Sequence, residues 1–343
     1  MLCLSLVSGC TSVRLTIVEI TEHSDNFVVI ETLKTDFGIN RTRLMAVCNE
    51  FYRHYEDEFD VLVLMAHNPA RILDQWGDGI RGKLDVVRNA EVGTGIKTRD
   101  FGRRYGSGGR LKGIVQLVHP DLILSGVLLH EIMHLWIGEI EVIPTVSKSH
   151  WGFSSVGGQL GGFQRDELNF LGEGKYSAGD FWPHVAIKST PYSPLEMYLA
   201  GWLPPDEVPD VWVAEDGSWL IQGATEEERK NQRDEDGNKI FTASKISTWS
   251  IEQIIEKLGP RSPDFEDSQK EFRIAFVLVT DGRVPVRDTE TSVLNLYIEQ
   301  FTRQGPVSDW LLKQLQYEQR HNFWEATQGV ATMHAGGLQS FRR

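Results

Sequence analysis

Hydrophobic positions in the first part of the chain predict a hairpin, a helix and a buried strand. Residues 13–20 and 27–33 are rich in β-forming residues and are expected to pair as a hairpin. Between residues 42 and 55 the apolar side chains recur at three- and four-residue steps, which indicates an amphipathic helix with one apolar stripe. Residues 59–66 are apolar almost without interruption, as in a strand that is buried on both faces.

The middle of the chain alternates between glycine-rich segments and two apolar elements. Residues 89–113 are rich in Gly and Arg and are expected to form a mobile loop with solvated cations. A strand is predicted over 113–118, ended by Pro120, and a helix over 125–137. Residues 151–201 show little periodicity, but their aromatic content argues against disorder, so we expect a long loop that carries function.

The last third of the chain is predicted to contain three helices and one strand. The helices are expected over 250–258, 291–304 and 306–320, and the strand over 272–280. We expect residues 211–343 to be mostly irregular and helical. They either complete the preceding domain or form a packed unit of their own.

Composition and charge exclude several classes of protein. The chain has 343 residues, of which 41% are hydrophobic and 24% charged, as in globular proteins. Its net charge of −13 argues against nucleic acid as a partner, because phosphate binding needs a basic surface. The chain contains no run of about 20 apolar residues, so the sequence predicts no membrane-spanning helix. The three cysteines, Cys3, Cys10 and Cys48, are too few for a disulfide framework.

The first ten residues form a short apolar run that ends in Val-Ser-Gly-Cys. This segment, residues 1–10, resembles the signal of bacterial lipoproteins, in which Cys10 would carry the lipid anchor. The usual positively charged start is missing, so the resemblance implies a truncated signal. It also implies an extracytoplasmic protein, either secreted or lipid-anchored, in a bacterium. An ordinary first β-strand is the alternative interpretation.

The strongest chemical signal is His-Glu-Ile-Met-His at residues 130–134, inside the predicted helix. Residues i and i+4 of a helix share one face, so His130 and His134 are predicted to reach one metal ion. Glu131 is placed to take a proton from water on that metal. The rest of this helix is apolar, and three buried titratable groups without partners would be costly. A bound zinc ion removes that conflict.

A catalytic zinc site takes three protein ligands and keeps one position for water, so a third ligand is expected. His150 is favoured because it lies close after the helix, next to Trp151 in a glycine-rich segment. Glu196 is the rival, on a short helix that Pro194 opens. Glu196 also fits two other roles: a carboxylate at a helix N-terminus, or an acceptor that orients a ligand imidazole. The remaining candidates are Glu139, Glu141, Asp166, Asp180 and His184.

Three residues near Glu196 have candidate supporting roles. Tyr198 is predicted to stabilise the developing oxyanion, and Tyr192 is its alternative, although each also fits a simple packing role. Met197 fits a position beneath the metal or an ordinary place in the core.

The His-Glu-x-x-His helix and the elements before it resemble those of the zincin metallopeptidases. The resemblance implies an α+β fold, in which a twisted mixed sheet packs on the motif helix and an edge strand, here 113–118, lines the substrate cleft. It implies a catalytic domain over residues 11–210. The metzincin continuation is absent, because Ile137 and Ile140 stand where that pattern needs Gly and His. The segment from Leu128 to Pro209 also resembles uncharacterised secreted bacterial proteins of peptidase type.

The sequence therefore predicts a zinc-dependent endopeptidase. Its partner is expected to be a protein or peptide that pairs with an edge strand through backbone hydrogen bonds. The alternative is a secreted or lipid-anchored binding module whose zinc is structural, with Glu196 as the fourth ligand beside three histidines. A hydrolase of a non-peptide amide is a third possibility with the same chemistry.

Overall fold

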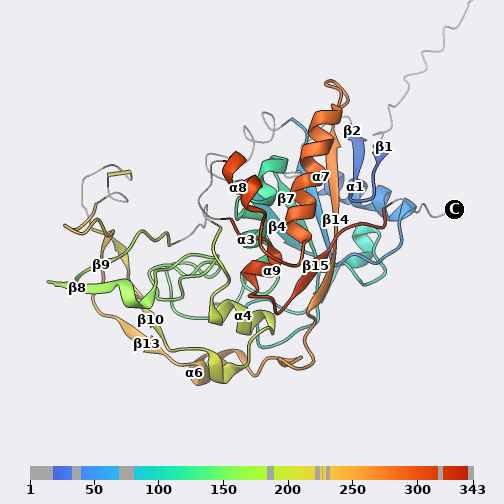
Figure 1. Cartoon of the computed structure of the whole chain (residues 1–343). Coiled ribbons are helices and arrows are strands. Elements are labelled where there is room, and N and C mark those ends of the chain that lie inside the picture. Colours follow the sequence, from blue (N-terminus) through green and yellow to red (C-terminus); the bar gives the residue numbers. More distant parts are fainter. Residues whose placement is uncertain are drawn as a thin grey trace, which may run out of the picture.

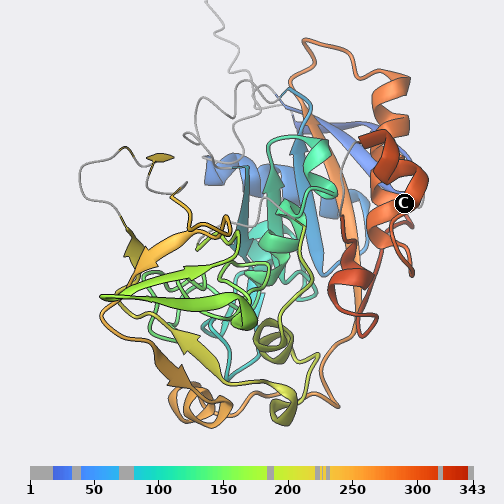
Figure 2. The same cartoon turned by 60° about the vertical axis from the view of Figure 1, so that its left-hand side comes forward.

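The computed structural model describes residues 18–32, 40–68, 81–183, 189–220, 225, 227–228, 232–315 and 320–338. The expected lipoprotein segment at residues 1–10 and the candidate ligand His184 lie outside these ranges. A large sheet with helices on both sides stands beside a lobe of short strands (Figures 1 and 2).

The main sheet has seven strands in the order β1-β2-β14-β3-β7-β4, with β15 pairing with β14 off this path. The central strands β2, β14, β3 and β7 are parallel, whereas β1 and β4 are antiparallel to their neighbours. The prediction of an α+β chain with a mixed sheet is therefore confirmed. The strands are β1 (Val18–His23), β2 (Phe27–Thr32), β3 (Val61–Ala66), β4 (Gly82–Val86), β7 (Gly113–Leu117), β14 (Glu271–Thr280) and β15 (Thr332–His334).

The prediction that residues 113–118 form an edge strand is wrong. Strand β7 lies between β3 and β4, and β4 occupies the edge in a register that sets Gly82 opposite Leu117. Strand β4 was not predicted from the sequence. It has only five residues and none of them is fully buried, so its alternation gives a weak signal.

Alternate side chains of the central strands face two different cores, as the two-residue period of a strand requires. On one face, Leu62 and Leu64 of β3 pack in the same cluster as the apolar stripe of helix α1 (Arg41–His54). On the other face, Val61 belongs to the cluster that surrounds helix α3 (Val127–Met133). The predicted helix over 42–55 and the hairpin of β1 and β2 are confirmed.

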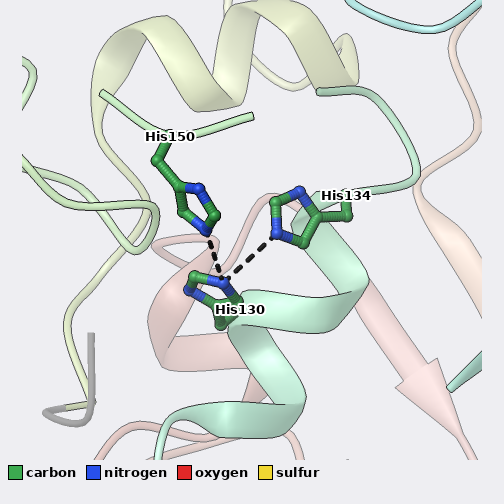
Figure 3. Close-up of side chains that lie close together, drawn as sticks. All are labelled: His130, His134 and His150. Atoms are coloured by element: carbon green, nitrogen blue, oxygen red, sulfur yellow. Dashed lines mark hydrogen bonds between the residues drawn. The ribbon is translucent and has the colours of Figure 1, made fainter. Parts of the chain in front are cut away.

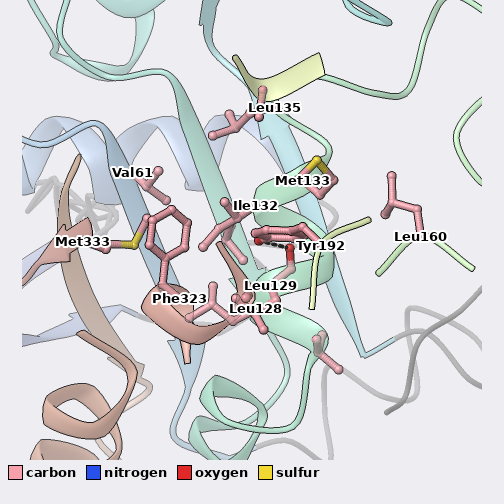
Figure 4. Close-up of a cluster of buried hydrophobic side chains, with 14 of the residues drawn as sticks. Val61, Leu128, Leu129, Ile132, Met133, Leu135, Leu160, Tyr192, Phe323 and Met333 are labelled. Carbon is pink, nitrogen blue, oxygen red and sulfur yellow. Dashed lines mark hydrogen bonds between the residues drawn. The ribbon is translucent and has the colours of Figure 1, made fainter. Parts of the chain in front are cut away.

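Helix α3 is buried on almost its whole circumference. Leu128, Leu129 and Ile132 have no exposed surface, and Figure 4 shows them among apolar side chains from the sheet and from Phe323. Each such burial contributes about 1.5–3 kcal/mol, so the helix is firmly held. It ends earlier than predicted, at Met133, because the N–H groups of Leu135 and Trp136 donate to carbonyls three residues back instead of four.

Shorter elements fill the segments that were predicted to be loops. Residues 89–113 contain β6 (Arg99–Asp100), which pairs with β5 (Arg88–Asn89), so this segment is more regular than expected. Residues 151–201 contain a hairpin of the small sheet β11-β12-β9-β8, whose aromatic core includes Phe153 and Phe241. The lobe strands are β8 (Leu168–Gly172), β9 (Lys175–Ala178), β10 (Val211–Val213), β11 (Ser218–Trp219), β12 (Ile240–Thr242) and β13 (Ser247–Trp249).

The C-terminal third completes the main sheet. Strand β14 lies between β2 and β3, near the centre of the sheet, and the helices around it share the core of α3. The predicted helices and strand of this region are present with shifted ends. None of the helices in the described ranges is long and apolar enough to cross a membrane. The remaining helices are α4 (Pro194–Ala200), α6 (Ile251–Leu258), α7 (Asp288–Thr302), α8 (Asp309–Leu315) and α9 (Phe323–Ala326).

Candidate metal centre

Three histidine side chains converge at the C-terminal end of α3. The Nε2 atom of His130 lies 3.2 Å from Nε2 of His134 and 3.3 Å from Nε2 of His150. His130 and His134 come from the helix and its last turn, and His150 reaches them from the following loop (Figure 3). The ligand atoms of the three residues all lie within 4.8 Å of one another, so the group is close enough to hold a metal ion.

The opposite nitrogen of each ring faces an oxygen atom. Nδ1 of His130 lies 3.1 Å from the carbonyl oxygen of Gln159, and Nδ1 of His134 lies 2.9 Å from that of Ile137. A carbonyl only accepts, so both Nδ1 atoms carry the proton and both Nε2 atoms present a lone pair. Nδ1 of His150 lies 3.0 Å from the hydroxyl of Ser149. Oxygen partners of this kind orient metal-binding imidazoles in proteins.

The two Nε2 separations that involve His130 fit a tetrahedral metal ion. Zinc binds imidazole nitrogen at about 2.0–2.1 Å, and two ligands of a tetrahedron are then about 3.3–3.4 Å apart. The separations of 3.2 and 3.3 Å match this edge length. Two neutral rings that face each other with lone pairs repel, and a cation between them removes the repulsion. The donor set therefore fits a metal ion that binds imidazole nitrogen, a group of ions that includes zinc.

Burial keeps the two helix histidines neutral. It lowers the pKa of His130 well below its ordinary value, and the neighbouring His134 and His150 lower it further. Burial also lowers the pKa of His134. Neutral imidazole is the form that binds metal, so the site is prepared for a cation at pH values where an exposed histidine is partly protonated.

Glu131 points toward the edge strand β4. Burial raises the pKa of its carboxyl to about 8, while a hydrogen bond from the backbone of Leu84 and the charge of Lys83 lower it. Gly82 permits this close approach, because a Cβ there would lie 2.8 Å from the Glu131 carboxylate and 2.7 Å from Val127. The acid of the motif is thus held between the helix and the edge of the sheet.

In the metal-free protein, replacing Glu131 with Gln is expected to raise stability at high pH. The folded-state pKa of about 8 exceeds the ordinary value of 4.5. The folded chain therefore binds more protons between these values, and the wild type loses stability as pH rises through them. Since one pKa unit is worth about 1.4 kcal/mol, Glu131→Gln gains about 2–4 kcal/mol over wild type between pH 4.5 and 8.

Urea unfolding of both metal-free proteins at pH 5 and pH 8 measures this effect as a change in their stability difference. The pH-dependent contribution of the histidines to stability is the same in both proteins, so it cancels in the difference. A difference that does not change with pH would contradict the burial of an ionisable carboxyl at this position.

The structure does not bring Glu196 to the three histidines. Its side chain has no exposed surface, and the metal-binding group found in the described part of the chain contains only His130, His134 and His150. Its two oxygens accept four N–H donors, including the indole of Trp151 at 2.8 Å. The carboxylate is committed to these bonds, so the sequence expectation of Glu196 as a ligand is not met.

Tyr198 also lies elsewhere. The hydroxyl of Tyr198 interacts with the backbone of Arg261. Tyr192 donates from its hydroxyl to the carbonyl of Leu129 at 2.9 Å, beneath the motif helix (Figure 4). Met197 is buried and its sulfur accepts a hydrogen bond from Gln328. All three residues have packing roles, and the described contacts place none of them at the histidines.

The remaining candidates form surface ion pairs or face solvent. Glu139 pairs with Arg99, and Glu141 with Lys257. Asp180 pairs with Arg233 and Lys239, and Asp166 is exposed. None belongs to the metal-binding group found among the described residues.

Gln159, whose backbone carbonyl orients His130, was not among the predicted site residues. No sequence signal marks such a residue, because the interacting atom is a main-chain carbonyl. No protein family, curated protein or solved structure matches the chain.

Proposed function

We propose that the protein is a zinc-dependent peptidase. The observation that carries the proposal is the convergence of three imidazole Nε2 atoms at a helix whose next residue after His130 is an acid, Glu131, at the edge of the main sheet. Among the described residues the group has three imidazole ligands and no fourth protein ligand, a set typical of catalytic zinc, which keeps one position for water or substrate. The acid next to the first ligand supplies the proton transfer that hydrolysis needs.

His130, His134 and His150 would hold the zinc ion through their Nε2 atoms. Zinc supplies a Lewis acid that polarises the substrate carbonyl and lowers the pKa of water. A bound cation favours the charged form of a neighbouring acid, so with zinc in place the Glu131 carboxylate would accept the proton of the attacking water and deliver it to the leaving amine. The bonds to the carbonyl oxygens of Gln159 and Ile137 keep two of the imidazoles in the required tautomer throughout.

The edge strand favours a peptide as the substrate. Strand β4 pairs with β7 on one side and with no other strand among the described residues. On its other edge the backbone of Leu84 bonds to Glu131, and an extended peptide would bind along the rest of that edge as an added strand. This position replaces the 113–118 strand of the sequence prediction. A small non-peptide amide has no extended backbone and cannot bind as an added strand.

A closed, structural zinc site is less well supported. That alternative needs a fourth protein ligand, and its candidate Glu196 already accepts four hydrogen bonds. Location outside the cytoplasm stays a proposal that rests on the resemblance of residues 1–10 to a lipoprotein signal.

Removal and return of the metal tests the proposed function. Treatment with dipicolinate is expected to abolish cleavage of an unfolded protein such as casein, and one equivalent of Zn²⁺ is expected to restore it. Cleavage of short quenched-fluorescence peptides serves as the quantitative measurement. Cleavage that survives complete removal of zinc, or a zinc-loaded protein that cleaves no peptide, would refute the proposal.

A further inference from the structure

We propose that Glu196 is a positioning residue that holds the metal-binding histidines in place through the backbone on which they depend. This inference rests on the metal centre of the proposed function. It assigns a purpose to a fully buried carboxylate that binds no metal and touches no histidine in the described contacts.

Each oxygen of Glu196 accepts two hydrogen bonds. Oε1 accepts from the indole of Trp151 and from the backbone of Leu160, both at 2.8 Å. Oε2 accepts from the backbone N–H groups of Gln159 and Ser193, both at 2.9 Å. Ser193 is the N-cap of α4, so the carboxylate also fixes the helix that carries it. Four charge-assisted bonds to one buried group make a rigid junction.

One branch of this junction leads to His130. The N–H of Gln159 donates to Glu196, and the carbonyl of the same residue accepts from Nδ1 of His130. The Gln159 side chain is fixed as well, since it donates to the carbonyl of Gly126 at 2.7 Å and accepts from Thr190 at 2.9 Å. With Gln159 held at both ends, its carbonyl sets the tautomer and the direction of the imidazole.

The other branch leads to His150. Trp151 follows His150 directly, and its indole donates to Glu196. Its backbone N–H donates to the carbonyl of Leu160 at 3.0 Å, while the N–H of Leu160 donates back to Glu196. The loop that carries His150 is therefore held by hydrogen bonds to the carboxylate of Glu196. Helix α3 alone positions only His130 and His134.

Gly158 shows how tightly the carboxylate is enclosed. A Cβ atom added to Gly158 would overlap the carboxylate of Glu196, although the backbone at this residue does not lie in the left-handed region. The glycine is needed for space and not for its backbone angles. An alanine at this position pushes the carboxylate away without changing its charge, which gives a second way to disturb the junction.

Glu196→Gln is the sharpest test, because the two side chains have the same shape. A carboxamide has one accepting oxygen and one donating nitrogen. In either orientation the nitrogen faces two N–H donors: those of Trp151 and Leu160, or those of Gln159 and Ser193. Whichever way the amide turns, one of the two branches therefore loses its pair of hydrogen bonds to residue 196.

Binding of Co²⁺ to the metal-free chain is the measurement, since cobalt reports both affinity and ligand geometry by its visible absorption. We expect Glu196→Gln to weaken Co²⁺ binding about 10–100-fold, the usual effect of losing an outer partner of a metal ligand. We also expect the visible absorption of the fully loaded variant to differ from that of the wild type.

Asp60→Asn is the matched control. Asp60 is also a buried carboxylate, 1% exposed, and it accepts hydrogen bonds from Arg110, Gln269 and the backbone of Arg273. It has no contact with the Gln159 or Trp151 branch among the described interactions. We expect this variant to lose thermal stability but to keep the Co²⁺ affinity within twofold and the absorption spectrum of the wild type.

A wild-type spectrum and affinity in Glu196→Gln would overturn the positioning role while leaving the metal centre intact. Equal weakening in Glu196→Gln and Asp60→Asn would overturn it too, because affinity would then follow stability alone. Failure of the wild type to bind Co²⁺ would instead refute the metal centre and this inference with it. If Glu196→Gln does not fold, Gly158→Ala and Trp151→Phe are measured in its place, with weakened binding expected and unchanged binding contradicting the proposal.

Discussion

Glu131→Gln is expected to reduce kcat/KM for peptide cleavage about 10²–10⁴-fold while leaving the zinc content of the protein unchanged. The loss follows from removal of the general base, whose usual contribution has this size. Zinc is retained because the metal-binding group contains His130, His134 and His150 and not the acid between them. Zinc content by mass spectrometry and cleavage of a fluorogenic peptide measure the two quantities on one preparation.

Glu141→Gln is a suitable control for this variant, because Glu141 forms a surface ion pair with Lys257 and lies outside the site. It is expected to keep wild-type activity. Loss of zinc together with activity in Glu131→Gln would show that the acid is a ligand. Full activity in Glu131→Gln would exclude it as the base.

His150→Ala is expected to weaken zinc binding more than about 100-fold, beyond the effect of losing an outer partner of a ligand. Peptide cleavage is expected to fall to background at stoichiometric zinc. The reason is geometric: His150 is the member of the cluster that the motif helix does not supply, and its Nε2 lies 3.3 Å from that of His130. Competition with a fluorescent zinc chelator measures the affinity.

His334→Ala is the matched control, since His334 lies on β15 and its ring pairs with Thr332. Its zinc affinity is expected to equal that of the wild type. Wild-type zinc affinity in His150→Ala would reject His150 as a ligand, and equal weakening in both variants would indicate a loss that is not specific to the site.

The local pattern of the sequence predicted the elements that are buried and regular. Helix α1 and strands β3 and β14 were found because their apolar residues follow a clear period or an unbroken run. The pairing of β14 with β2 and β3 could not be predicted from local patterns, because more than two hundred residues separate these neighbours along the chain. Edge strand β4 was missed since its residues are only partly buried.

The candidate site was predictable to the extent that its chemistry lies in side chains with fixed spacing. His130, Glu131 and His134 follow from the helical repeat, and His150 was favoured by its distance and its glycine-rich surroundings. The sequence could not decide between the possible roles of Glu196, because its partners include the backbone N–H groups of Gln159 and Leu160, which leave no pattern in the sequence.

X-ray absorption at the zinc edge tests the central claim most directly. The account predicts one zinc ion per chain, bound by three imidazole nitrogens and one oxygen from water at about 2.0–2.1 Å. A protein that takes up no zinc, or a zinc ion with four protein ligands and no water, would contradict it.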